Sequence, residues 1–394
     1  MADERNPYVA VDNTLRTNVI ANGYLEVTPL KGLTFRSNFG SNIDFRRRGI
    51  YNDRTALSQA NNRTAVASTE NTFNRFINWD NILTYSRDLG KHTVTLTGIT
   101  SYIRSDVDNT YASGTNQLLA SQLFYDLSST STAVTRTLLS PYVGSKNMAY
   151  AARLNYSYAG RYLLTVSGRY DGASRLAEGN KWDFFPSVAL GWNILDEAFL
   201  RDTRWLSQLK LRASYGVSGN YSISPYGTQS VLSASSRMSF GEVPAQTYQF
   251  QPTVGNPNLG WEKSASLNLG LDVAVFNNRL TATVDVYNTN TSDILLLRPL
   301  PLSSGVGQVY ENIGATRNRG IEIAITSQNI ATDKLRWSTT LTFSRNKEQI
   351  TQLIDGRDII ATSSPEVNSL LLDRPISSFY TYQKLGIWQT SEAD

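Results

Sequence analysis

Residues 263–290 read KSASLNLGLDVAV-FNNR-LTATVDVYNTN, and this stretch decides the fold. Apolar side chains occupy every second position over 265–275, and the positions between them are mostly polar. After the turn at 276–279 the same alternation resumes over 280–287. Because a strand places alternate side chains on opposite faces, the stretch predicts an antiparallel hairpin with one apolar face and one polar face.

The same two-faced pattern recurs along most of the chain. It predicts strands at residues 18–28, 33–45, 74–86, 92–105, 148–158, 161–171, 183–194, 207–217, 262–276, 279–290, 319–329, 335–346 and 379–388. Long two-faced strands are what a transmembrane β-barrel requires, with lipid on one side and water on the other.

The connections between these strands alternate in length. Short connections are 29–32, 87–91, 159–160, 276–279 and 330–334, whereas long ones are 49–73, 106–147, 172–182, 218–261, 291–318 and 347–378. Connection 195–206 falls on the short side but is longer, and it reads as one or two helical turns with Asp196 at the N-cap. Short turns at one rim and long loops at the other are typical of an outer-membrane barrel with its short turns in the periplasm. A soluble sandwich has no reason to keep this alternation.

The polar faces of the predicted strands carry charged residues. Charges in a membrane-spanning sheet need water or an opposite charge, and a barrel lumen supplies both. The residues that we expect to face the lumen are Arg36, Arg153, Arg169, Arg212, Asp272, Asp285, Glu322 and Arg336.

Aromatic residues gather near the ends of the predicted strands. Rings with a polar tip prefer the membrane–water interface, although ordinary packing in a large soluble sheet is the alternative explanation. The predicted interface aromatics are Tyr158, Tyr162, Trp182, Trp192, Trp261 and Trp337.

These patterns predict an all-β fold, an antiparallel up-and-down transmembrane β-barrel that is only partly present. About 12–13 strands are expected out of a barrel of roughly 22. Residues 1–394 are expected to form a single barrel domain, incomplete at both ends and without a plug domain. The sheet should therefore have open edges at 18–28 and near 379–388.

Composition excludes several classes of function. The chain has no cysteine and a single histidine, His92, so thiolate sites and multi-histidine zinc sites are impossible. A net charge of +4, with both signs mixed along the chain, does not favour nucleic-acid binding. No catalytic, metal-binding or cofactor-binding residue is predicted, and the chain is not expected to be an enzyme. No run of apolar residues is long enough for a transmembrane helix.

Six sequence blocks together resemble the SusC/RagA-like family of TonB-linked outer-membrane proteins. They are residues 20–40 (ending PLKGLTFRSNFG), 162–175 (YLLTVSGRYDGASR), 185–192 (FPSVALGW), 206–220 (containing LKLRASYGVSGN), 256–263 (NPNLGWEK) and 312–322 (NIGATRNRGIE). In their spread and order the blocks extend over nearly the whole chain. The resemblance implies a large barrel with a plug domain that imports a bulky nutrient, an oligosaccharide or a peptide. It also implies two partners, a SusD-like surface lipoprotein that lids the barrel and the TonB–ExbB–ExbD complex, besides outer-membrane lipid.

Two long loops, 106–147 and 218–261, are the predicted contacts for substrate or lid. Their aromatic side chains can stack on sugars or pack on a protein, and packing within the loops is the alternative for each. These residues are Tyr111, Phe124, Tyr125, Tyr142, Tyr221, Tyr226, Tyr248 and Phe250. Two other functions stay open at this point, a soluble β-rich binding or adhesion module and an outer-membrane barrel enzyme that depends on His92.

Overall fold

The structure is a computed structural model that describes residues 6, 8–59, 61, 64–117, 119–131, 136–200, 203–240, 243–250, 253–360, 369–383 and 386. The strands are β1 (Ala10–Leu30), β2 (Leu33–Asn52), β3 (Val66–Leu89), β4 (His92–Thr115), β5 (Thr137–Leu139), β6 (Tyr142–Tyr158), β7 (Tyr162–Ala173), β8 (Trp182–Asn193), β9 (Leu206–Asn220), β10 (Leu232–Phe240), β11 (Val243–Phe250), β12 (Thr253–Val254), β13 (Glu262–Val275), β14 (Leu280–Pro299), β15 (Gln308–Ala331) and β16 (Arg336–Gln352). Five 3₁₀ turns interrupt the connections: η1 (Leu57–Gln59), η2 (Ala120–Gln122), η3 (Ile194–Asp196), η4 (Leu302–Ser304) and η5 (Ile354–Gly356).

In the described residues the strands form one 14-stranded sheet and one separate hairpin. The order in the sheet is β1-β2-β3-β4-β6-β7-β8-β9-β13-β14-β15, with β16 and β12 on β15 and β5 on β4. The pairing follows chain order and is antiparallel except for the short β12, which runs parallel to β15. The hairpin β10–β11 makes a two-stranded sheet of its own. The all-β, up-and-down fold is therefore as the sequence predicts.

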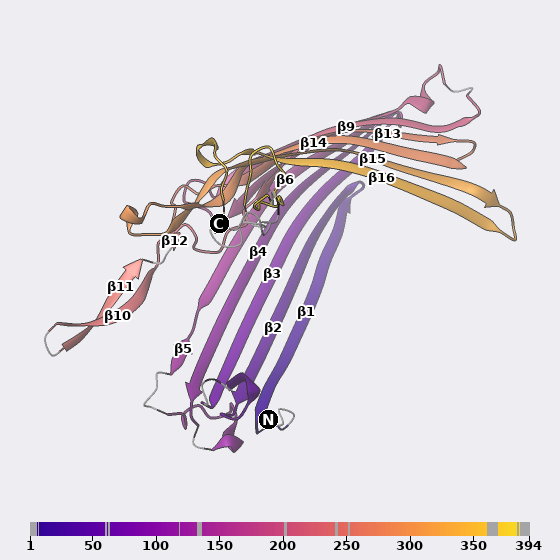
Figure 1. Cartoon of the computed structure of the whole chain (residues 1–394). Helices are drawn as coiled ribbons and strands as arrows, with labels where there is room; N and C mark the ends of the chain where they lie inside the picture. Colours follow the sequence, from indigo (N-terminus) through magenta and orange to yellow (C-terminus); the bar gives the residue numbers. More distant parts are fainter. Residues whose placement is uncertain are drawn as a thin grey trace. The chain divides into compact units, whose positions relative to one another are not determined.

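The chain divides into two compact units. The first comprises residues 1–85, 97–151 and 171–175, and the second comprises 86–96, 152–170 and 176–394. In the first unit β1, β2, β3 and β4 are long and lie side by side (Figure 1). In the second unit the ladder β9–β13–β14–β15–β16 is continuous.

Twelve of the thirteen predicted strands are present, and several are longer than predicted. Every extension of ten or more residues lies at the end joined by a long connection, as in β15, which begins at Gln308 and not at 319. The predicted loop 291–318 is wrong for most of its length, because β14 and β15 stay paired up to Pro299 and Gln308.

The predicted strand at 379–388 is wrong where the structure describes it, since residues 379–383 and 386 are not strand. The edge of the sheet in the described residues is β16, which pairs with β15. The predicted edge at the other side is confirmed as β1.

The turns follow from their residues. Gly32, Gly90 and Gly160 adopt positive φ in the short turns, where a Cβ would be strained. The turn 276–279 has positive φ at three consecutive residues, two of them asparagine, the non-glycine residue that best tolerates this conformation. In the connection after β8 the helical turn η3 ends at Asp196, so the prediction of Asp196 as an N-cap is wrong.

Most of the buried side chains lie in the long connections and at the strand ends that they join, although Leu206 and Ala274 are buried at the short-turn end. In the first unit Tyr51, Ala65 and Ala67 form a small core with Leu123 and Leu127. In the second unit Leu176 and Leu259 are fully buried, and the amide of Ala177 donates to the carbonyl of Leu259. Most of the sheet has no such cover, and large apolar side chains such as Ile20 and Leu341 are more than 60% exposed.

Candidate functional site: the two faces, the rims and the loops

Register divides the side chains of the sheet into two sets. The set that we call the apolar face includes Leu269, Val286, Ile321 and Arg345, which occupy neighbouring rungs of β13 to β16. Below Arg345, on the side of the short turns, this face is almost continuously aliphatic or aromatic. The opposite set, the polar face, carries most of the ion pairs described below.

The strongest contact of the polar face joins three strands. Arg212 on β9 donates to both carboxylate oxygens of Asp272 on β13, at 2.8 and 3.0 Å, and to both oxygens of Asp285 on β14, at 3.1 Å each. Between them lies Gly270, where an added Cβ would come within 2.5 Å of the guanidinium carbon and 2.6 Å of an Asp285 oxygen. Three predicted lumen residues are thus brought together, and a glycine makes room for them.

The polar face of the first unit holds a ladder of ion pairs between β1, β2 and β3. Arg48 pairs with Asp12, Arg16 with Asp44, Arg36 with Glu26, and Arg46 with Glu70. Of the predicted lumen residues, Arg36 is part of this ladder. The remaining predicted lumen residues, Arg153, Arg169, Glu322 and Arg336, are exposed on their strands.

An aromatic row lines the short-turn rim, the strand ends that the short turns join. The His92 ring lies 4.9 Å from Tyr158 in a tilted arrangement, Tyr158 lies 6.3 Å from Tyr162, and Tyr162 lies 6.4 Å from Trp192. The carboxylate of Glu197 accepts from Tyr162, Trp192 and Arg161 at 2.5, 3.1 and 2.9 Å. The Tyr162 hydroxyl holds the pKa of Glu197 below its usual value. Three predicted interface aromatics are therefore in one row, tied to a carboxylate that the sequence analysis missed.

The other predicted interface aromatics are divided. Trp337 is 57% exposed and belongs to the apolar face of β16, and Trp182 is exposed and stacks on Tyr170 at 5.0 Å. Trp261 is only 6% exposed, because its ring packs against Phe185 and Tyr221 and its Nε1 donates to the Lys181 carbonyl. Trp261 is thus covered by neighbouring side chains, and its location at the membrane interface stays a prediction.

The connection after β4 is anchored on β2. Phe124 is 4% exposed and covers Gly49 so closely that an added Cβ there would lie 2.1 Å from its ring. The next residue, Tyr125, is 66% exposed, and the Arg47 guanidinium lies over its ring at 5.5 Å. Phe124 is thus a packing residue with little surface for a ligand, whereas Tyr125 is presented outward.

The other predicted loop aromatics vary in exposure. Tyr226 and Tyr248 are exposed, and Tyr111 and Tyr221 are half-buried. Tyr142 is 53% exposed and donates to Asp106. Phe250 belongs to β11, and its side chain lies outside the described residues.

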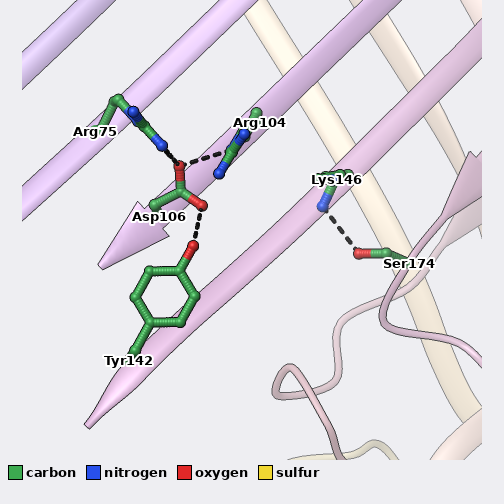
Figure 2. A network of polar contacts seen from close by, with 6 residues as sticks. All are labelled: Arg75, Arg104, Asp106, Tyr142, Lys146 and Ser174. Carbon is green, nitrogen blue, oxygen red and sulfur yellow. Dashed lines mark hydrogen bonds and ion pairs between the residues drawn. The ribbon is translucent and has the colours of Figure 1, made fainter. Parts of the chain in front are cut away.

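Asp106 is the centre of a network that the sequence analysis also missed (Figure 2). Asp106 is 5% exposed, and its carboxylate accepts from Arg75, Arg104 and Tyr142 at 2.6, 2.8 and 2.7 Å. Arg75 is opposite Ile43, so the network lies on the apolar face, toward the long connections. Because charged side chains do not suit the hydrocarbon core of a membrane, the part of the apolar face that lipid tails can cover ends at the level of these charges.

The described residues contain neither a metal-binding cluster nor a helix suited to span a membrane. In the part of the chain that the structure describes, no three His, Asp or Glu side chains are placed to hold a metal ion. None of the helices described has the length and hydropathy needed to cross a membrane.

Comparison with known proteins gives a consistent family. The sequence profile described as "TonB dependent receptor-like, beta-barrel" matches residues 4–389. TonB-dependent receptor P3 of Formosa agariphila is 35% identical over 400 residues, which cover 98% of this chain and 39% of that protein. TonB-dependent receptor SusC of Bacteroides thetaiotaomicron is 33% identical over 253 residues, or 60% of this chain and 25% of SusC.

A solved structure agrees with these relatives. The structure of the RagAB peptide transporter contains a chain that matches with a TM-score of 0.82 and 25% identity, over 94% of this chain and 40% of that one. The chain thus spans about two fifths of the length of receptor P3 and of the matching chain in the RagAB structure.

Proposed function

The chain belongs to the SusC-like TonB-dependent receptor β-barrels, and on that premise we propose that it forms wall and outer loops of an importer for a bulky nutrient. The observation that carries the proposal is the match of nearly the whole chain, residues 4–389, to the receptor barrel profile. The family is an outer-membrane family, and its members are receptors and transporters. The soluble module and the barrel enzyme considered above therefore lose their support.

In this proposal the polar face lines the lumen of one barrel domain over residues 1–394. The contacts of Arg212 with Asp272 and Asp285, and the ladder from Asp12 to Glu70, fix the charged side chains to the wall. Paired charges keep this part of the corridor hydrophilic while they satisfy one another.

The proposed ligand contacts are aromatic residues of the long connections. Tyr125, Tyr226 and Tyr248 are exposed, and Tyr rings bind sugars or peptide side chains through one apolar face and one hydroxyl. The solved relative is a peptide transporter by its title. The loops here are rich in Ser and Thr and weakly charged, which favours neutral oligosaccharides. We therefore propose an oligosaccharide or peptide as the nutrient.

Two partners follow from the same premise. A SusD-like surface lipoprotein would cover the long-connection side, where Tyr125 and the β10–β11 hairpin offer surface outside the main sheet. The TonB–ExbB–ExbD complex would supply the energy through parts of the receptor beyond these residues.

The proposal is tested by comparing the growth of a strain that lacks the receptor with the growth of the same strain after the receptor is returned. The full-length receptor is returned on a plasmid, and growth is measured on a panel of oligosaccharides and on peptide digests as sole nutrient. We expect growth on at least one of them to need both the receptor and TonB. Growth is then compared between two variants. Tyr125→Ala removes the exposed ring and tests ligand contact, whereas Phe124→Tyr changes the buried ring and tests packing of the loop.

Two results would refute the proposal. One is growth on every nutrient without the receptor, and the other is receptor-dependent growth that continues when TonB is deleted. Affinity purification of the tagged receptor tests the lid, and recovery of no lipoprotein under conditions that keep the receptor folded would reject that partner.

A further inference from the structure

Four cationic side chains lie together on the apolar face of β15 and β16. They are Arg317, Arg319, Arg345 and Lys347, which we call the basic cluster. Arg319 is directly opposite Lys347, and Arg345 is opposite Ile321, one rung nearer the short turns. The next rung in that direction pairs Ile323 with Phe343. The cluster therefore begins where the aliphatic part of the face ends.

Among the strands that the structure describes, no acidic residue shares the rungs of the basic cluster on this face. The positions opposite Arg319 and Arg317 on β14 are Asn288 and Asn290. The nearby carboxylates of Glu322 and Glu348 alternate with the cluster along their strands and so belong to the polar face. The asparagine neighbours thus leave the positive charge uncompensated.

The cations of the cluster have almost no partners. Arg317 donates to the side-chain oxygen of Asn290 at 3.0 Å. In the described residues the side chains of Arg319, Arg345 and Lys347 make no ion pair or hydrogen bond with another side chain, and all four cations are exposed. Like charges directly opposite on paired strands destabilise a sheet, so this arrangement calls for an anion from outside the chain.

The Asp106 network is the contrast within the same chain. There two arginines also lie on the apolar face beyond its aliphatic part, but Asp106 accepts from both of them (Figure 2). Two cations of the first unit therefore share an internal carboxylate, whereas Arg319, Arg345 and Lys347 have no such partner in the described residues.

The cluster lies at the level expected for lipid headgroups. Lys347 is ten residues after Trp337, which is exposed on the same face at the short-turn end of β16. At about 3.3 Å per residue and a tilt of about 40°, ten residues rise about 25 Å, the height of the apolar band of an outer-membrane barrel. With Trp337 at one interface, Arg345 and Lys347 reach the other.

We propose that the basic cluster binds the phosphate groups of anionic lipid headgroups in the leaflet on the long-connection side. Arg forks match phosphate oxygens, and each cation at an anionic membrane surface adds about 1 kcal/mol. The proposal depends on the outer-membrane location of the family and is independent of which nutrient is imported.

The test uses the full-length receptor in nanodiscs of phosphatidylcholine with added lipid A, either bisphosphorylated or dephosphorylated. Lipids that remain bound after extraction are counted by native mass spectrometry. We expect the wild type to retain the bisphosphorylated lipid, and the combined variant Arg317→Gln, Arg319→Gln, Arg345→Gln, Lys347→Gln to retain it at least about tenfold less. The control variant Lys31→Gln, Lys91→Gln, Lys334→Gln, Arg336→Gln removes the same charge at the short-turn rim and should retain it normally.

Further measurements keep the outcome unambiguous. Replacing the three arginines of the cluster by lysine should preserve binding, and thermal unfolding should show that all variants are folded. Equal retention of lipid A by the wild type and the cluster variant would overturn the proposal, as would equal retention of the dephosphorylated lipid. Displacement by inorganic phosphate at low concentration would indicate a site for a free anion, and loss only of a co-purifying protein would indicate a protein surface; both would overturn it.

Discussion

Gly270 is the residue on which the strongest ionic contact of the polar face depends. Its missing side chain lets the Arg212 guanidinium cross β13 to reach Asp285. We expect Gly270→Ala to displace Arg212 and weaken both of its ion pairs. The cost should be about 1–3 kcal/mol, because one carboxylate would stay partly buried without its cation. Chemical unfolding of the full-length receptor in detergent measures it.

Gly98 provides the control for this substitution. It also lies inside a strand, but an added Cβ there would meet nothing within 4 Å. Gly98→Ala should therefore be neutral or slightly stabilising, since alanine restricts the unfolded chain. If the two variants unfolded alike, the space above Gly270 would have no role in stability.

Glu197 predicts a pH dependence at the short-turn rim. Hydrogen bonds from Tyr162 and Trp192 favour its charged form and lower its pKa from the ordinary value of 4.5. A carboxylate with a lowered pKa contributes stability above the unfolded value, and that contribution is lost as the pH falls through the folded value. We expect the rim to loosen below about pH 4.5 and the fluorescence of Trp192, which bonds to Glu197, to change there.

Two variants check the assignment of that transition to Glu197. Glu197→Gln should remove the acid transition in fluorescence, and Tyr162→Phe should move it toward pH 4.5, because the largest cause of the shift is then absent. An unchanged transition in Glu197→Gln would assign it to another group.

The strands show which part of an element can be predicted from sequence. Alternation identifies a strand only where one face must be apolar, as over 279–290 and 319–329. Beyond that level β14 and β15 stay paired, but Arg317 and Arg319 occupy the apolar face and the alternation ends. Backbone hydrogen bonds do not need the pattern, so the strands predicted from sequence end too early in β14 and begin too late in β15.

The candidate site was predictable to the same extent. The alternation of side chains along a strand predicts that Arg212, Asp272 and Asp285 share one face of the sheet. Their contact with one another depends on the register of three strands, which the sequence alone does not give. The burial of Phe124 and Trp261 depends on how long connections fold back, and an aromatic residue in a loop looks the same in sequence whether it is covered or exposed. Glu197 and Asp106 gave no signal, because single acidic residues are common in connections and strand ends.

The connection after β4 predicts a coupling between a loop and a strand. Phe124 covers Gly49 on β2, so Gly49→Ala should expel the ring and loosen residues 116–131. Limited proteolysis of the full-length receptor should then cut this connection several times faster than in the wild type. Gly23→Ala, where nothing lies within 4 Å, is the control. Equal cleavage of both variants would show that Phe124 does not anchor the loop.

At the scale of the whole chain, the two faces of the sheet differ in how their charges are neutralised. Ion pairs within the chain neutralise most charges on the polar face, so it can line a water-filled space without attracting every ion. Beyond the aliphatic part of the apolar face, Asp106 accepts hydrogen bonds from two arginines, and lipid phosphate is proposed for the basic cluster. The same sheet is thus matched to water on one side and to a layered membrane on the other.

The ends of the sheet predict how residues 1–394 behave when produced alone. In the described residues β1 pairs only with β2 and β16 only with β15, which leaves two open edges of about twenty residues. Unpaired strand edges associate with other chains. Since the chain has no cysteine, Thr17→Cys on β1 and Thr339→Cys on β16 introduce the only two thiols. We expect oxidation in detergent to link different chains into oligomers. A disulfide within one chain would mean that β1 and β16 meet and the sheet closes on itself, contrary to this prediction.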